Sequence, residues 1–184
     1  MKLVIRNARI SFPELFEASQ FQGQGPFNYR ASFLVTPDSQ AKKDIDAAIS
    51  QVASDKWGKK ADQYLPGLKS NPQKICFIDG NLKAYNGYEN MWALSASRNQ
   101  DNGAPVVVDG RKNPIRASDG KIYGGCYVNA VVEIWAQDNS FGKGIRATLV
   151  SVQFVKDGES FGGAAPATDD GLDDLGDDFD EDLL

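Results

Sequence analysis

The stretch from Lys83 to Tyr123 mixes positively charged and aromatic residues in a sequence rich in turns. Cations can follow the phosphates of a nucleic acid, and aromatic faces can stack with unpaired bases. Sequence-tolerant binding of a single strand needs this combination. Arg30, on the polar side of an earlier strand, joins the set as a further phosphate contact. The candidate residues of the stretch itself are Lys83, Tyr85, Tyr88, Trp92, Arg98, Arg111, Lys112, Arg116, Lys121 and Tyr123.

The aromatic residues also have structural interpretations. Trp92 lies in the alternating segment MWALSAS, and a tryptophan in such a strand belongs to the core more often than to a surface. Trp135 lies in the apolar run VVEIWA, so we expect it in the core and leave it out of the contact set. Tyr85 and Tyr88 flank the turn Asn86-Gly87, where we expect both side chains to be exposed.

The last sixteen residues, Asp169 to Leu184, contain nine carboxylates, no basic residue and five large apolar side chains. The whole chain carries −5, so residues 1–168, with 20 Lys and Arg against 16 Asp and Glu, carry +4. A flexible string of carboxylates can imitate a nucleic-acid backbone. We therefore expect this acidic tail to compete for the surface that binds nucleic acid.

The apolar side chains of the tail suggest a second role. Several of them recur at spacings of three and four, so a helix would align them, although Gly171 and Gly176 make that helix unstable in the free protein. Such a segment can fold when it docks on a partner protein. The expected docking and autoinhibitory residues are Asp177, Asp178, Phe179, Asp180, Glu181, Asp182, Leu183 and Leu184.

Composition disfavours an enzyme. The chain has no histidine, which excludes Ser-His-Asp and Cys-His nucleophiles and zinc sites that contain histidine. Cys76 and Cys126 lie in strand-like apolar runs and are expected to be buried thiols in a reducing cytosol, too few for a Cys-rich zinc site. We expect neither a metal nor a cofactor.

Two alternatives remain open. One is an interaction module or DNA mimic that acts through the acidic tail, with the rest of the chain as a scaffold. The other is a Mg²⁺-dependent nuclease, although its carboxylates stand mostly in turns, where Asp is expected for backbone reasons. The carboxylates of such a nuclease would be Asp79, Glu89, Asp101 and Asp109.

The pattern of hydrophobic residues predicts a mainly β protein with one helical insertion. The helix is expected over Gln40–Trp57, capped by Thr36 or Asp38, and a loop is expected from Gly58 through LPGLKSNP. This count favours a single Greek-key barrel of the oligonucleotide-binding (OB) type. The expected strands are Lys2–Ser11, Asn28–Thr36, Lys74–Ile78, Met91–Arg98, Ala104–Val108, Gly124–Ala136 and Gly144–Val155.

The composition divides the chain into three parts. Residues 1–160 form the expected OB domain, 161–168 a flexible Gly/Ala/Pro linker, and 169–184 a disordered acidic tail. No run of 18 apolar residues is present, so no membrane span is expected, and the N-terminus lacks the apolar core of a signal peptide. We expect the protein in the cytoplasm.

The sequence resembles a family of bacteriophage single-stranded DNA-binding proteins with an OB fold, and the acidic end with its terminal hydrophobic residues is similar to the tails of such proteins. The resemblance covers most of residues 1–163. The matching segments are VIRNARISFPELFEA (Val4–Ala18), FNYRASFLVTPDS (Phe27–Ser39), Asp79-Gly80-Asn81, GGCYVN (Gly124–Asn129) and GIRATLVSVQFVKDGESFGG (Gly144–Gly163).

The resemblance implies sequence-independent binding to phage DNA during replication or recombination, in the host cytoplasm. It also implies protection of single strands and contacts between the tail and replication or recombination proteins. Duplex DNA is expected to become a ligand when the tail is removed. The resemblance assigns no residue-level contacts, so the expected contact residues remain those chosen from their chemistry.

Overall fold

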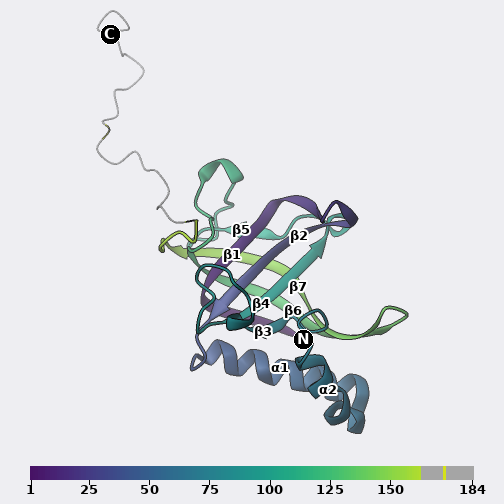
Figure 1. The fold of residues 1–184 in the computed structure, drawn as a ribbon. Coiled ribbons are helices and arrows are strands. Elements are labelled where there is room, and N and C mark those ends of the chain that lie inside the picture. The colour runs from purple at the N-terminus through teal and green to yellow at the C-terminus, as the bar shows by residue number, and fades with distance from the viewer. Residues whose placement is uncertain (163–171, 173–184) are drawn as a thin grey trace, which may run out of the picture.

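The computed structural model describes residues 1–162 and Leu172, so most of the expected linker and all of the expected docking residues lie outside the described residues. The described part confirms a mainly β fold (Figure 1). One sheet has the strand order β3-β4-β2-β1-β6-β7-β5. Its strands are β1 (Lys2–Phe21), β2 (Gln24–Val35), β3 (Phe77–Asp79), β4 (Trp92–Asn99), β5 (Val106–Val108), β6 (Tyr127–Asn139) and β7 (Gly142–Lys156).

A parallel pairing between β4 and β7, at Ser97 and Thr148, closes β1, β2, β4, β7 and β6 into a barrel. Closure satisfies strand edges that would otherwise be free. The short strands β3 and β5 lie outside this ring, β3 antiparallel to β4 and β5 parallel to β7. The fold is the expected OB type, and its core is filled by inward side chains such as Ile5, Phe33 and Leu149.

Strand β1 continues ten residues beyond the expected end at Ser11. Its pairing with β2 shifts register between Ser11 and Glu14, where Phe12 has a positive φ of 48°. The first half of the strand pairs with β6, and the second half pairs with β2. The bulge breaks the alternation of apolar and polar residues, so the sequence pattern stops where the strand bends.

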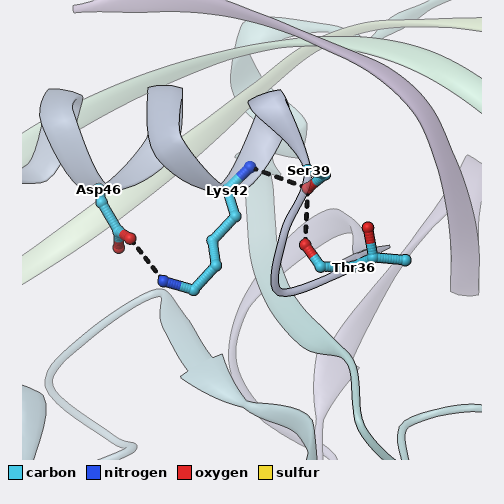
Figure 2. A network of polar contacts seen from close by, with 4 residues as sticks. All are labelled: Thr36, Ser39, Lys42 and Asp46. Carbon is cyan, nitrogen blue, oxygen red and sulfur yellow. Dashed lines mark hydrogen bonds and ion pairs between the residues drawn. The ribbon is translucent and has the colours of Figure 1, made fainter.

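Helix α1 spans Gln40–Trp57, as expected, and buries the predicted apolar face against the barrel. Its cap is Ser39 rather than Thr36 or Asp38. The Ser39 Oγ accepts a hydrogen bond from the Lys42 backbone N–H (3.2 Å) and donates one to the Thr36 carbonyl oxygen (2.7 Å; Figure 2). An ion pair of 2.6 Å between Lys42 and Asp46 follows one turn later (Figure 2).

The segment after α1 is helical, so the expectation of a loop there is wrong. A short 3₁₀ turn, η1 (Gly58–Lys60), leads into α2 (Ala61–Lys69), which contains Pro66. Tertiary packing outweighs the local cost of the proline, because Leu68 is buried and Tyr64 packs edge-on against Trp57, with 5.6 Å between ring centroids. Three further 3₁₀ turns are η2 (Gly80–Leu82), η3 (Gln100–Asn102) and η4 (Ala117–Asp119).

Both cysteines are free and buried, as expected. Burial raises the pKa of Cys76 to about 12 and also raises the pKa of Cys126. Neither thiol therefore has the thiolate character that a reactive cysteine needs at neutral pH. Within the described part of the chain, no helix is both long enough and apolar enough to cross a membrane.

Candidate nucleic-acid interface

A groove of about 620 Å³ lies over the outer face of β2 and β4. Its floor comes from alternate residues of these two strands: Arg30 lies opposite Ser97, and Ser32 lies opposite Ser95. Successive side chains of a strand point to opposite faces, so the residues next to these, such as Phe33 after Ser32 and Leu94 before Ser95, enter the core. We call this surface the β2–β4 groove. Strand β1, strand β7 and the segment before β4 form its walls.

Positive charge dominates the β2–β4 groove. Arg30 on β2, Arg146 on β7 and Lys83 after η2 line it, and Glu14 is the one carboxylate among the described lining residues. Hydrogen bonds hold both arginines. Arg146 donates from Nε to Gln137 Oε1 (2.8 Å) and from Nη1 to the Gln73 carbonyl oxygen (2.9 Å), and Arg30 Nη2 donates to the Ser19 carbonyl oxygen (3.2 Å). Fixed cations suit a phosphate backbone because little side-chain freedom is lost on binding.

Two exposed phenylalanines of β1 form the rim of the groove. Phe12 is 59% exposed and Phe21 is 65% exposed. The positive φ of Phe12 is rare for a bulky residue, and such strain often marks a functional position. Phe12 also packs edge-on against Tyr85, with 4.9 Å between ring centroids. The Arg30 Cζ lies 5.8 Å from the centroid of the Phe21 ring.

Three residues predicted from sequence lie at or near this site. Arg30 and Lys83 line the groove, and Tyr85 is exposed beside Phe12 on its rim. Phe12, Phe21 and Arg146 were missed. They lie far from the cationic stretch in sequence, and only the β1 bulge and barrel closure bring them to it. The resemblance segments contain Phe12 and Arg146, but no spacing marks them as contacts.

Tyr88 belongs to the core, and Trp92 is half-buried against it. Tyr88 is 3% exposed, so the expectation of an exposed turn tyrosine is wrong. The turn packs against η2, where the backbone carbonyl of Tyr88 lies against Gly80. Trp92 is half-buried, packs against Phe77 with 5.2 Å between ring centroids, and does not line the β2–β4 groove.

Arg98 and Tyr123 make hydrogen bonds that fix loops. Arg98 donates to the carbonyl oxygens of Gly103 and Asn102, each at 2.8 Å. The Tyr123 hydroxyl lies 2.9 Å from Asp157 Oδ1 and 3.0 Å from the Gly158 carbonyl oxygen, and partial burial raises its pKa. Both side chains therefore stabilise the fold locally and lie outside the groove.

The four remaining cations lie in residues 109–126, which we call the β5–β6 loop. In Figure 1 this loop, coloured teal-green, projects away from the barrel above β5. All four side chains are exposed, and none lines the β2–β4 groove. The sequence thus predicted one cationic surface, and the structure divides it between two places. The four cations are Arg111, Lys112, Arg116 and Lys121.

Trp135 is 41% exposed, so its expected place in the core is wrong. It lies on the outward face of β6 opposite Arg146, and its Nε1 donates to Thr148 Oγ1 (3.1 Å). The β6–β7 hairpin beyond it is braced against the helices. Trp57 Nε1 donates to Asp138 Oδ2 (2.9 Å), which lowers the pKa of that carboxyl, and Asp138 also pairs with Lys143 at 3.6 Å.

Two of the carboxylates considered for a nuclease, Asp79 and Asp109, have local backbone roles. Asp79 Oδ1 accepts from the Asn81 N–H (2.9 Å). Asp109 Oδ1 accepts from the N–H groups of Asn113 and Arg111 (2.9 and 2.8 Å), which lowers the pKa of Asp109. In the portion of the chain that the structure describes, no three side chains of the metal-binding types gather into a group.

Phe161, the first residue of the expected linker, is fixed on the barrel. Its N–H donates to the Gly124 carbonyl oxygen (3.0 Å), and Asn86 Nδ2 donates to the Phe161 carbonyl oxygen (2.9 Å). The Arg9 Cζ lies 4.3 Å from its ring centroid. Gly87 is required beneath the ring, because a Cβ there would lie 2.1 Å from a ring carbon. Phe161 and Phe12 line one shared pocket, so the chain leaves the barrel beside the groove rim.

Comparison with known proteins gives consistent results. The family model described as the ssDNA-binding protein of Enterobacter phage Enc34 matches residues 1–184. A "putative protein p50" from Acyrthosiphon pisum secondary endosymbiont phage 1 is 43% identical over 187 residues, covering 100% of this chain and 99% of that protein.

Two solved structures show the same fold. The single-stranded DNA-binding protein of bacteriophage Enc34, solved in complex with ssDNA, is 28% identical with a TM-score of 0.71, over 87% of this chain and 89% of that one. The single-stranded DNA-binding protein gp2.5 of bacteriophage T7 is 13% identical with a TM-score of 0.55, over 96% and 98%, and supports the fold alone. The matched family is defined by binding rather than by catalysis, as expected for a non-enzyme. This chain belongs to the family of the Enterobacter phage Enc34 ssDNA-binding protein.

Proposed function

We propose that this protein binds single-stranded DNA without sequence preference, and that the strand lies in the β2–β4 groove. The observation that carries the proposal is the meeting of three cations and two exposed phenylalanines over β2 and β4. In OB folds this face is the one that binds oligonucleotides. The family membership and the DNA complex of the Enc34 relative support the same ligand. We propose that the bound strand is phage DNA and that binding takes place in the host cytoplasm.

Titration of a labelled oligo-dT by fluorescence anisotropy tests the proposal. Affinity should fall as salt rises, with log K decreasing by about 0.7 per neutralised phosphate for each unit of log salt concentration. Oligo-dC should bind within about tenfold of oligo-dT, since stacking tolerates sequence. Absence of binding, or an affinity that does not respond to salt, would contradict it.

We further propose that the acidic tail competes with DNA for the groove and docks replication or recombination proteins when DNA displaces it. The tail has nine carboxylates, whereas residues 1–168 carry a net charge of +4. The anchored Phe161 starts the remaining chain next to Phe12 on the groove rim. Seven residues, 162–168, separate Phe161 from the tail, and a connection of this length gives an effective concentration in the millimolar range. Weak contacts can therefore compete with DNA.

Removing residues 169–184 should raise affinity for oligo-dT by about tenfold at low salt, because the competing charge is lost. The truncated protein should also bind duplex DNA. A control chain keeps the tail length and changes its Asp and Glu residues to Asn and Gln; it should behave like the truncation. Unchanged affinity in both variants would refute the competition.

A further inference from the structure

We infer that a single strand lies in the β2–β4 groove with its phosphodiester backbone against the strands and its bases turned outward. This orientation rests on the proposed function and adds to it which part of the nucleotide meets the floor. The floor consists of Ser32, Ser95, Ser97 and Arg30. None of these side chains offers an aromatic face on which a base could stack.

The hydroxyl groups of the floor suit phosphate oxygens. Ser95 and Ser97 are exposed, and Ser32 is half-exposed. Ser32 Oγ and Ser95 Oγ lie 3.2 Å apart, so two hydroxyls from adjacent strands form one polar patch. A hydroxyl group can rotate to donate to whichever anionic oxygen approaches. These short side chains also let a backbone approach the strands closely.

The cations border the same floor. Arg30 lies on β2 and Arg146 on β7, while Lys83 reaches the groove from the segment after η2. Arg30 Nε has no hydrogen-bond partner in the described residues although the atom is buried. The buried Nε is closed to a ligand, so a phosphate oxygen would meet the outer Nη groups of this guanidinium, of which Nη2 also donates to the Ser19 carbonyl oxygen. Floor and borders therefore both favour phosphate.

The aromatic surfaces lie above the floor. Phe12 and Phe21 are the aromatic residues in the described lining of the groove, and both belong to β1 at its rim. Stacking on an aromatic ring stabilises a bound base, and a serine floor cannot supply that contact. The bases therefore stack on the rings of Phe12 and Phe21 at the rim, and their base-pairing edges point toward solvent. This arrangement leaves room for a complementary strand.

Uniformly modified oligonucleotides test the orientation, because the protein cannot avoid the modification by sliding. The probes are an oligo-dT, an abasic oligomer of equal length, and an oligo-dT with neutral methylphosphonate linkages. They are compared on the full chain and on the Phe12→Ala, Phe21→Ala double variant at low salt. Both phenylalanines are largely exposed, so the fold should persist, which circular dichroism checks. If the double alanine variant does not fold, the Phe12→Leu, Phe21→Leu double variant takes its place.

The double variant should bind the abasic oligomer and oligo-dT within about threefold of each other, because its remaining contacts are to the backbone. The methylphosphonate oligomer should bind at least 100-fold more weakly than oligo-dT to the full chain. A preference of tenfold or more for oligo-dT over the abasic oligomer in the double variant would overturn the orientation, since bases would then meet the floor. Failure of the full chain to bind unmodified oligo-dT would reject the proposed function as well.

Permanganate oxidation of bound oligo-dT gives an independent readout, since the reagent attacks the exposed face of thymine. Most thymines should keep at least half of their reactivity in the complex. Protection of every thymine by tenfold or more would contradict bases turned toward solvent.

Discussion

The β2–β4 groove and the β5–β6 loop carry similar positive charge, with three cations in the groove and four in the loop. They differ in how that charge is held. The groove is concave, hydrogen bonds fix its arginines, and phenylalanines border it. The loop projects from the barrel, and its cations are exposed. Exposed charges attract a polyanion from a distance, whereas fixed charges in a concave surface can hold it in one place.

The largest difference in DNA affinity should appear when two positive charges are removed from the β2–β4 groove or, separately, from the β5–β6 loop. The Arg30→Gln, Arg146→Gln variant should lose at least 100-fold in oligo-dT affinity, because two charge-assisted hydrogen bonds contribute about 1.5–3 kcal/mol each. The matched Arg111→Gln, Arg116→Gln variant should lose less than fivefold. Fluorescence anisotropy at fixed salt measures both. Equal losses of oligo-dT affinity in the two variants would contradict the proposed difference between the groove and the loop.

Tyr88 tests whether a central aromatic belongs to the core. Tyr88→Ala should lower the free energy of unfolding by about 3–5 kcal/mol, as for other large buried side chains. The folded variant should keep its affinity for oligo-dT. Tyr85→Ala, at an exposed neighbour, should change stability much less. Urea denaturation measures the difference, and a large loss of affinity in folded Tyr88→Ala would contradict the core assignment.

The rim phenylalanines should each contribute one stacking contact. Phe12→Ala and Phe21→Ala should each weaken oligo-dT binding by about tenfold, within the 1–3 kcal/mol of a stacked base. Phe16 offers a matched control, because it lies on the same strand, is 39% exposed and does not line the groove. Phe16→Ala should stay within twofold of the unchanged protein. An equal effect at all three positions would point to nonspecific loss of stability.

Cys76 allows a test of the buried wall of the groove, as distinct from its accessible surface. It lines the groove but is buried, and this burial raises the pKa of its thiol to about 12 from an ordinary value of 9.0. The thiol stays protonated in the folded state while the unfolded chain loses its proton above pH 9. Folding stability is therefore full below pH 9 and falls above it, by up to about 1.4 kcal/mol per pH unit. Unfolding free energies at pH 8.5 and 10 should show a smaller decline in Cys76→Ala, and an identical decline would contradict the shift.

Local patterns predicted what local interactions decide. The apolar stripe of α1 gave its bounds correctly, because one face of a helix repeats every three to four residues. The alternation in β2 and β7 likewise placed those strands within a few residues. Pro66 made the sequence pattern predict a loop where α2 forms, and the bulge at Phe12 ended the alternating pattern before the second half of β1. In both cases tertiary packing outweighed the local sequence pattern.

The groove could be predicted only in part. Arg30 and Lys83 carry a visible signal, since each cation stands in a polar or turn-like context. Arg146 and Phe21 join them only through the closure of β4 against β7 at Ser97 and Thr148 and through the long β1–β2 hairpin. Phe21 and Arg146 are more than 100 positions apart in the sequence, so no local pattern connects them. Density of cations along the sequence favoured the β5–β6 loop instead. Barrel closure, rather than composition, decides which cations share a surface.

Photo-crosslinking tests the central claim most directly. An oligo-dT that contains 5-iododeoxyuridine is bound to the full chain, irradiated and digested, and the crosslinked peptides are sequenced. The halogenated base reacts with aromatic rings that stack on it, so crosslinks should concentrate at Phe12 and Phe21. Crosslinks confined to residues 109–126, with none on β1, would show that DNA lies on the β5–β6 loop and would contradict the groove.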